Sequence, residues 1–268
     1  MEYRLIALDL DGTILPRGQP ISPRVVQAIR AAVTLGIQVV LASGRMFRVL
    51  APYAEQLGID GPLICYGGAL IRRALNGGVL YEQRLPQELA CEVVQVGREL
   101  GLPIHAYVDD ELYVEGLTPA HPMYARLRRE YTHAVDDLDH FLRRNGPPPH
   151  HMALVTARDR EVLVRRLKER FGTRLNVTTG HPNLAEIDHP NVSKGTALRW
   201  LAEQLGIPRE QVLAVGDDHN DLTMITYAGL GVAMGHAPAA VRAMAQVIVP
   251  SLDGDGIARV LEEYVLGR

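Results

Sequence analysis

The stretch that decides the fold is Leu5-Ile6-Ala7-Leu8-Asp9-Leu10-Asp11-Gly12-Thr13. Its apolar start predicts a short strand covered on both faces, and Gly12 predicts a turn directly after two carboxylates. Ligands of open α/β sheets bind beyond the carboxyl ends of the strands, which makes Asp9 and Asp11 candidate site residues. On an extended chain their side chains would share a face, although the turn at Gly12 can present Asp11 differently.

The segments around this stretch alternate strands with helices, which is typical of a parallel, doubly wound sheet. Ser22 and Pro23 predict the N-cap and first position of a helix that ends near Gly36. Another helix should end near Gly58. Further strands are expected at 37–42, 63–65, 212–215, 231–233 and 247–249, with helices at 194–205 and 256–265.

The pattern changes after Gly67-Gly68, where hairpins replace the alternation. Asn76-Gly77-Gly78 predicts a hairpin between 70–73 and 80–84, and Asp109-Asp110 predicts another between 104–108 and 112–114. We also expect helices at 86–100 and ending near 172, and strands at 152–156 and 175–179. The prediction is therefore an α/β protein whose doubly wound parallel-sheet (Rossmann-like) core, residues 1–83 and 186–268, carries an inserted α/β cap domain at 84–185.

Composition excludes several classes of function. The chain has 268 residues, 47% of them hydrophobic, and a net charge of −3, so no basic excess points to nucleic acid. Its two cysteines lack a Cys-x-x-Cys spacing, which argues against a disulfide framework or structural zinc. We find no signal peptide and no apolar stretch of the ~20 residues that a membrane span needs. We expect a cytoplasmic protein.

Three further clusters carry chemistry. Ser43-Gly44-Arg45 follows a strand, where a hydroxyl and backbone N–H groups can hold a phosphoryl oxygen. Lys194 begins a helix, although the helix dipole disfavours a cation there, and this suggests a role in neutralising phosphate. The run from Gly216 to Asp221 adds three carboxylates. Each cluster alone has an ordinary structural explanation, but two acidic clusters favour a divalent cation, and hard oxygen ligands suit Mg²⁺.

In this order, the four motifs resemble those of the haloacid dehalogenase superfamily, in its Cof-like branch of small-molecule phosphatases. That branch places a large α/β cap between the second and third motifs, where this chain has its irregular block. The resemblance implies a Mg²⁺-dependent phosphomonoester hydrolase that acts on a small phosphorylated metabolite such as a sugar phosphate. Relatives often have Asn-Gly-Ala where this chain has Gly67-Gly68-Ala69, so we expect the turn to be kept and the contacts of the asparagine to be lost.

The resemblance also implies a role for each motif residue. Asp9 would be the nucleophile that forms an aspartyl-phosphate, and Asp11 the general acid and base. The metal would be bound by Asp9, by Asp217 and by the backbone carbonyl of Asp11, with Asp221 in support. The phosphoryl group would be held by Leu10, Ser43, Gly44, Lys194 and Asn220, with Arg45 as a further candidate substrate contact.

Alternatives remain open at this point. A sugar phosphomutase would use the same nucleophile, and a receiver domain of a signalling system also combines acidic residues, a hydroxyl and a lysine on a parallel sheet. Near the return from the cap, His181, Asn183 and Glu186 are candidate substrate contacts. The sequence does not specify an oligomeric state.

Overall fold

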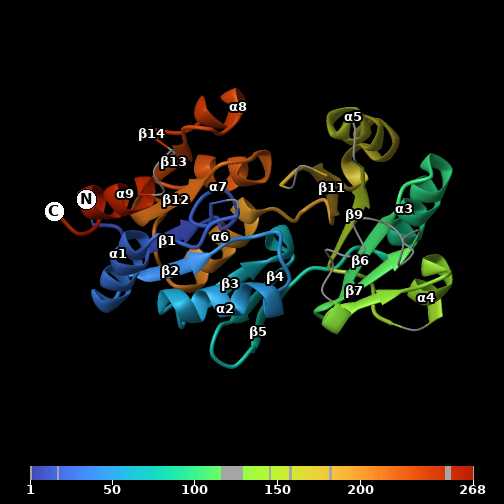
Figure 1. The fold of residues 1–268 in the computed structure, drawn as a ribbon, viewed down its shortest axis with the longest axis horizontal. Helices are drawn as coiled ribbons and strands as arrows, with labels where there is room; N and C mark the ends of the chain where they lie inside the picture. Colours follow the sequence, from blue (N-terminus) through green and yellow to red (C-terminus); the bar gives the residue numbers. More distant parts are fainter. Residues whose placement is uncertain are drawn as a thin grey trace. The chain divides into compact units, whose positions relative to one another are not determined.

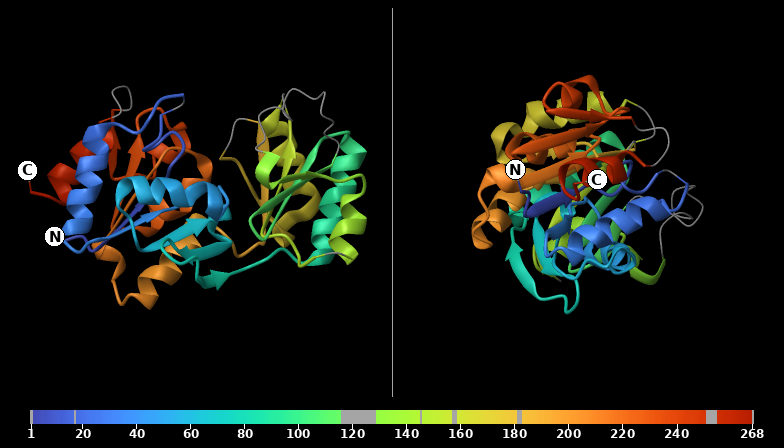
Figure 2. Two further views of the ribbon diagram at one scale, coloured as in Figure 1. Left: turned by 60° about the horizontal axis from the view of Figure 1, so that its bottom comes forward. Right: turned by 90° about the vertical axis from the view of Figure 1, so that its left-hand side faces the viewer.

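The computed structural model describes residues 2–16, 18–115, 129–144, 146–156, 159–180, 183–250 and 255–267, and it divides into two compact units (Figure 1, Figure 2). Unit 1 consists of Met1–Tyr81 and Ser193–Arg268, and unit 2 consists of Glu82–Val192. Strand β11 (Leu184–Asp188) pairs with a strand of unit 2, so the chain returns to unit 1 later than residue 186. No helix in the described ranges is long and apolar enough to cross a membrane.

Unit 1 contains the expected parallel sheet, in the order β14-β13-β12-β1-β2. Strand β1 (Leu5–Leu8) is completely buried and lies between two strands from distant parts of the sequence. All its neighbours run parallel to it, so the ends of these strands meet at one edge of the sheet. The other strands are β2 (Gln38–Leu41), β12 (Val212–Gly216), β13 (Leu230–Met234) and β14 (Val247–Val249).

Helices cover this sheet. Helix α1 (Pro23–Thr34) starts where predicted, but the Ser22 side chain does not cap it, because its hydroxyl donates to Asp255 Oδ1 at 2.7 Å. Helix α6 (Lys194–Gln204) and the short α7 (Leu222–Tyr227) pack against the sheet face that carries Leu5 and Ala7. The remaining helical segments are α2 (Phe47–Leu57), η5 (Arg209–Gln211), η6 (His219–Asp221), α8 (Ala239–Arg242) and α9 (Gly256–Tyr264).

Strand β3 (Pro62–Cys65) runs parallel to β2, as predicted, but it also has a neighbour of the opposite direction. It touches the parallel sheet through one bridge, Ala42 to Ile64, and pairs antiparallel with β4 (Leu70–Arg73). The chain reverses in η1 (Tyr66–Gly68), whose residues have φ angles of 50°, 62° and 114°. Such left-handed conformations suit glycine, which occupies two of the three positions. Strand β5 (Val79–Glu82) completes this sheet after the expected turn.

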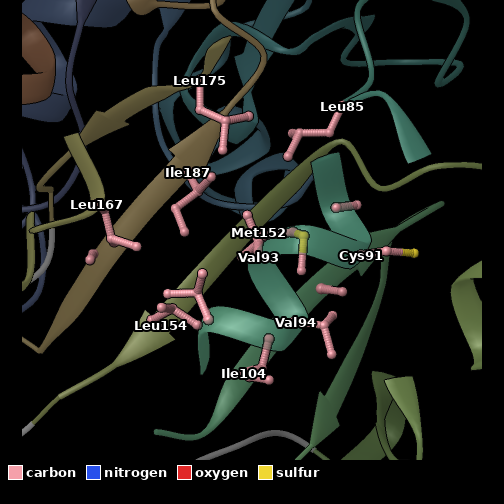
Figure 3. Close-up of a cluster of buried hydrophobic side chains, with 14 of the residues drawn as sticks. Leu85, Cys91, Val93, Val94, Ile104, Met152, Leu154, Leu167, Leu175 and Ile187 are labelled. Carbon is pink, nitrogen blue, oxygen red and sulfur yellow. The ribbon is translucent and has the colours of Figure 1, made fainter. Parts of the chain in front are cut away.

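Unit 2 has a six-stranded sheet in the order β10-β11-β9-β6-β7-β8. The predicted hairpin joins β6 (Ile104–Val108) to β7 (Glu111–Glu115), with Asp109 and Asp110 both at positive φ as a tight turn requires. The apolar face of the six-stranded sheet packs against α3 (Gln87–Leu100), where Val93 and Val94 lie in one cluster with Ile104 and Met152 (Figure 3). The other elements are η3 (Arg129–Tyr131), β8 (Thr132–Ala134), α4 (Leu138–Arg144), β9 (His151–Val155), α5 (Arg160–Phe171), η4 (Gly172–Arg174) and β10 (Asn176–Thr178).

Strands β9 and β11 also carry buried polar side chains. His151 Nδ1 lies 2.7 Å from Asp188 Oδ1 across the two strands, and both residues are buried. Glu186, a candidate substrate contact, is buried in β11, whereas His181 lies outside the described residues. The strands of unit 2 therefore include a buried histidine–aspartate pair where an apolar contact would be usual.

Candidate active site

Lys194 joins two of the motifs at the end of the parallel sheet. Its Nζ donates to Asp9 Oδ1 and to Asp221 Oδ1, each at 2.6 Å, and its side chain is only 1% exposed. The lysine at the N-terminus of α6, which is unfavourable for the helix dipole, thus binds two carboxylates. Burial alone would lower the pKa of Lys194, but the carboxylates of Asp221 and Asp9 overcome burial and raise it. The ammonium group therefore stays charged.

The acidic residues outnumber this lysine. Oxygens of Asp9, Asp217 and Asp221 all lie within 4.8 Å of one another. Burial and then the charge of Asp221 raise the pKa of Asp9 well above its ordinary value, although Lys194 acts in the opposite direction. The pKa of Asp217 is raised by the same two causes. A hard divalent cation would relieve this repulsion, and a set of carboxylate oxygens fits Mg²⁺.

Asp221 fixes the turn that follows β12. Its Oδ2 accepts hydrogen bonds from the backbone N–H groups of Asp217 and Asp218, at 2.8 and 3.0 Å. Its Oδ1 accepts the bond from Lys194. A Cβ at Gly216 would lie 2.4 Å from the Asp221 Cβ, so this packing requires glycine there. Asp221 therefore links the lysine to the backbone that carries Asp217.

The turn after β1 separates the first two carboxylates. Leu15 N–H donates to the Leu10 carbonyl at 2.8 Å, and Gly12 has a φ of 90°. Asp9 is buried beside Lys194, whereas Asp11 is exposed and turns to Arg45. The Arg45 guanidinium donates to both Asp11 oxygens, at 2.7 and 2.6 Å. The turn therefore gives the Asp11 side chain a direction different from that of Asp9, instead of the shared face that an extended chain would produce.

The second motif is held by the turn after β3. Ser43 is buried, and its carbonyl accepts a hydrogen bond from Gly67 N–H at 3.0 Å. Gly67 has a φ of 62°, so the expected turn is present without an asparagine. A Cβ on Gly68 would lie 2.3 Å from the Ser193 carbonyl oxygen, which places this turn directly against the start of α6. The loop carrying Ser43 and the helix carrying Lys194 are thereby fixed to each other.

The remaining candidates occupy the same strand-end loops. Leu10 is fully buried, and its carbonyl accepts from two backbone N–H groups of the turn. Gly44 lies between β2 and α2, and Asn220 lies in η6. All predicted motif residues therefore belong to unit 1.

Two side chains at the site were not predicted from the sequence. Thr13 Oγ1 donates to Asp217 Oδ1 at 2.8 Å, and His236 Nε2 lies 3.1 Å from Asp217 Oδ2. Thr13 is part of the decisive N-terminal stretch, and His236 follows the predicted strand at 231–233. Their positions just beyond strand ends were the available signal, since such positions face the ligand edge of a parallel sheet.

Comparison with known proteins agrees with this geometry. Residues 6–261 match the family of haloacid dehalogenase-like hydrolases, and the chain belongs to that family. It is 30% identical to phosphoglycolate phosphatase from Methanoculleus marisnigri, over 97% of this chain and 96% of that protein. It is 29% identical to 5-amino-6-(5-phospho-D-ribitylamino)uracil phosphatase YitU from Bacillus subtilis, over 97% of both chains.

A solved structure supports the same assignment. A haloacid dehalogenase-like hydrolase from Bacteroides thetaiotaomicron superposes with a TM-score of 0.82 at 32% identity, over 98% of this chain and all of that one. The protein is thus a phosphatase of the Cof-like branch, as the four motifs indicated. This excludes the receiver domain, whose phospho-aspartate would serve as a signal.

Proposed function

We propose that this phosphatase is a Mg²⁺-dependent phosphomonoester hydrolase that acts on a small phosphorylated metabolite, with a sugar phosphate as the leading candidate, through an aspartyl-phosphate on Asp9. The observation that carries the proposal is the buried contact of Lys194 with Asp9 and Asp221, beside Asp217. Phosphoryl transfer depends mainly on positioning and on neutralisation of charge, and this cluster supplies both.

Asp9 is the nucleophile in this proposal. The hydrogen bond from Lys194 to Oδ1 fixes the carboxylate at the end of β1. The same ammonium group offsets the repulsion between an anionic nucleophile and an anionic phosphate. Attack forms a bond from a carboxylate oxygen to phosphorus and breaks the bond from phosphorus to the leaving alkoxide. Water then cleaves the aspartyl-phosphate and regenerates Asp9.

Asp11 is the general acid for the leaving alkoxide and then the general base for water. In the structure both of its oxygens accept hydrogen bonds from Arg45. To protonate the leaving alkoxide, the carboxyl group of Asp11 has to face the substrate and not the guanidinium, so this ion pair has to open during the reaction. The phosphate of an incoming substrate is an alternative partner for the guanidinium, which gives Arg45 a role as a substrate contact.

Mg²⁺ would be held by Asp9, Asp217 and the backbone carbonyl of Asp11. When bound, it would neutralise charge on the phosphoryl group and on the two carboxylates. Asp221 would support the site indirectly, because its oxygens already accept three hydrogen bonds, one from Lys194 and two from the backbone of the turn. The phosphoryl oxygens would be bound by Lys194, by Ser43, and by the loop groups of Leu10, Gly44 and Asn220.

The test is phosphate release from a panel of phosphorylated metabolites, with and without Mg²⁺, by the wild type and Asp9→Asn. The panel should include sugar phosphates, phosphoglycolate and a phosphorylated ribityl compound. We expect release to require Mg²⁺ and to fall by more than about 1,000-fold in Asp9→Asn, because a neutral amide is a poor nucleophile. Asp60→Asn, at an exposed aspartate of unit 1, is the matched control.

Two results would contradict the proposal. Undiminished turnover by a clean preparation of Asp9→Asn would exclude Asp9 as the nucleophile. Conversion of a sugar phosphate into its isomer without free phosphate would show a mutase instead of a hydrolase.

A further inference from the structure

His236 lies next to an acidic residue of the site but outside the four motifs. It follows β13, whose residue Ala233 pairs with Gly216 at the end of β12, so its turn lies beside Asp217. Its Nε2 is 3.1 Å from Asp217 Oδ2. The other oxygen of Asp217 accepts a hydrogen bond from Thr13 at 2.8 Å. Each carboxylate oxygen thus has one partner and keeps a further lone pair that a cation can use.

The backbone around Asp217 restricts its side chain further. A Cβ on Gly12 would lie 2.4 Å from Asp217 Oδ2, so the carboxylate packs directly on the glycine backbone. Movement toward Gly12 is therefore blocked, and the two hydrogen bonds determine the rotation of the carboxylate plane. Thr13 and His236 contact opposite oxygens of this carboxylate.

The His236 turn is itself well anchored. Gly235 N–H donates to the Val249 carbonyl at 2.7 Å, and Ala237 N–H donates to the Met234 carbonyl at 2.9 Å. The Arg242 side chain donates to the Gly235 carbonyl at 3.3 Å. These bonds fix the backbone of the turn that carries His236 relative to β13 and β14.

His236 does not belong to the group of prospective ligands. At this site, the group of described residues whose ligand atoms lie within 4.8 Å of one another consists of Asp9, Asp217 and Asp221. The imidazole contacts one member of this group from outside it. Groups in such positions orient metal ligands, and their removal typically weakens metal binding 10–100-fold.

We propose that His236 is a positioning residue for the metal: it donates Nε2–H to Asp217 Oδ2 and, together with Thr13, holds that carboxylate in the orientation that binds the cation. The inference rests on the proposed function, since it assumes that Asp217 binds a divalent cation. It assigns His236 a role in metal affinity and none in bond making.

The test measures metal binding directly. Mg²⁺ affinity is measured by calorimetry and Mn²⁺ affinity by the electron paramagnetic resonance signal of the free ion, for the wild type and His236→Ala, His236→Gln and His236→Asn. We expect ~10–100-fold weaker binding in His236→Ala. His236→Gln should restore most of the affinity, because its amide nitrogen can replace Nε2, whereas the shorter Asn should not. His219→Ala, at an exposed histidine two residues from Asp217, should bind like the wild type.

The outcomes separate this inference from the proposed function. If the wild type binds neither ion, or if Asp217→Asn binds as tightly as the wild type, the metal site itself is wrong. If Asp217→Asn loses the metal and His236→Ala keeps wild-type affinity, only the role of His236 is wrong. A loss in His236→Ala confined to Co²⁺ and Zn²⁺, with Mg²⁺ unchanged, would make the imidazole a direct ligand and would also overturn the proposal.

Discussion

Lys194→Met should destabilise unit 1 by about 3–5 kcal/mol at pH 8 in the absence of metal, because it leaves two buried carboxylates without their cation. The methionine fills similar space, so packing is largely retained. The side chains of Lys194 and Asp221 are each 1% exposed and that of Asp9 is 7% exposed, so water cannot replace the ammonium group. With a urea m-value of about 1–3 kcal/mol/M, the midpoint of unfolding should fall by at least about 1 M.

The loss should shrink as the pH falls. Burial and the charge of Asp221 already raise the pKa of Asp9, and removing Lys194 takes away its lowering effect. A carboxyl group with a raised pKa in the folded state contributes stability at low pH, which is lost as pH rises through that value. The destabilisation should therefore be smaller at pH 5.5 than at pH 8.

The assay is urea denaturation in EDTA at both pH values, followed by fluorescence of Trp200. This is the single tryptophan of the chain, and it lies in α6 with Lys194, so it reports on unit 1. Lys168→Met, at an exposed lysine of α5, is the control and should unfold like the wild type. An unchanged midpoint for Lys194→Met at pH 8, or an equal loss at both pH values, would refute the reasoning.

Two further predictions concern the metal. Gly12→Ala should weaken Mn²⁺ binding at least ~10-fold in a paramagnetic resonance titration, because the added Cβ would lie 2.4 Å from Asp217 Oδ2 and the φ of 90° disfavours a side chain. Gly18→Ala is the control, since Gly18 also has a positive φ but has open space around it, and this variant should bind Mn²⁺ normally. Equal affinity in both variants would contradict the packing argument. The rise in melting temperature on adding Mg²⁺ should be larger at pH 8 than at pH 5.5, since the raised pKa values of Asp9 and Asp217 let protons compete with the metal at low pH; a rise independent of pH, measured by calorimetry, would argue against binding by these carboxylates.

Local pattern predicted most of the strands and long helices of unit 1. The two carboxylates directly after the first apolar run and the lysine at a helix start both indicated where chemistry lies, because each departs from what folding alone requires. Pairing direction was harder to predict. Strand β3 meets β2 in parallel as its composition predicts, but the left-handed turn at Tyr66–Gly68 reverses the chain, so that β4 pairs with β3 antiparallel. Nothing in the sequence distinguishes a tyrosine at a φ of 50° from one in an ordinary turn.

Contacts between motifs could not be predicted from the sequence alone. The pairing of Arg45 with Asp11, and of Thr13 and His236 with Asp217, depends on how the loops after four strands fit together. Each of these residues was visible as a polar residue near a strand end. Their partners are set by register and loop geometry, which a pattern of residue types does not contain.

The order of the chain also affects how the site is made during synthesis. Strand β1 pairs with β12, so Leu5 meets Val212 only after the whole of unit 2 has been synthesised. Until then β1, which is fully buried in the final sheet, has one open edge, and such edges favour aggregation. Unit 2 is continuous in sequence and can fold first, while the N-terminal segment waits for its partner. Folding of unit 1, and with it the meeting of Asp9 with Lys194, should therefore be the late step of biogenesis.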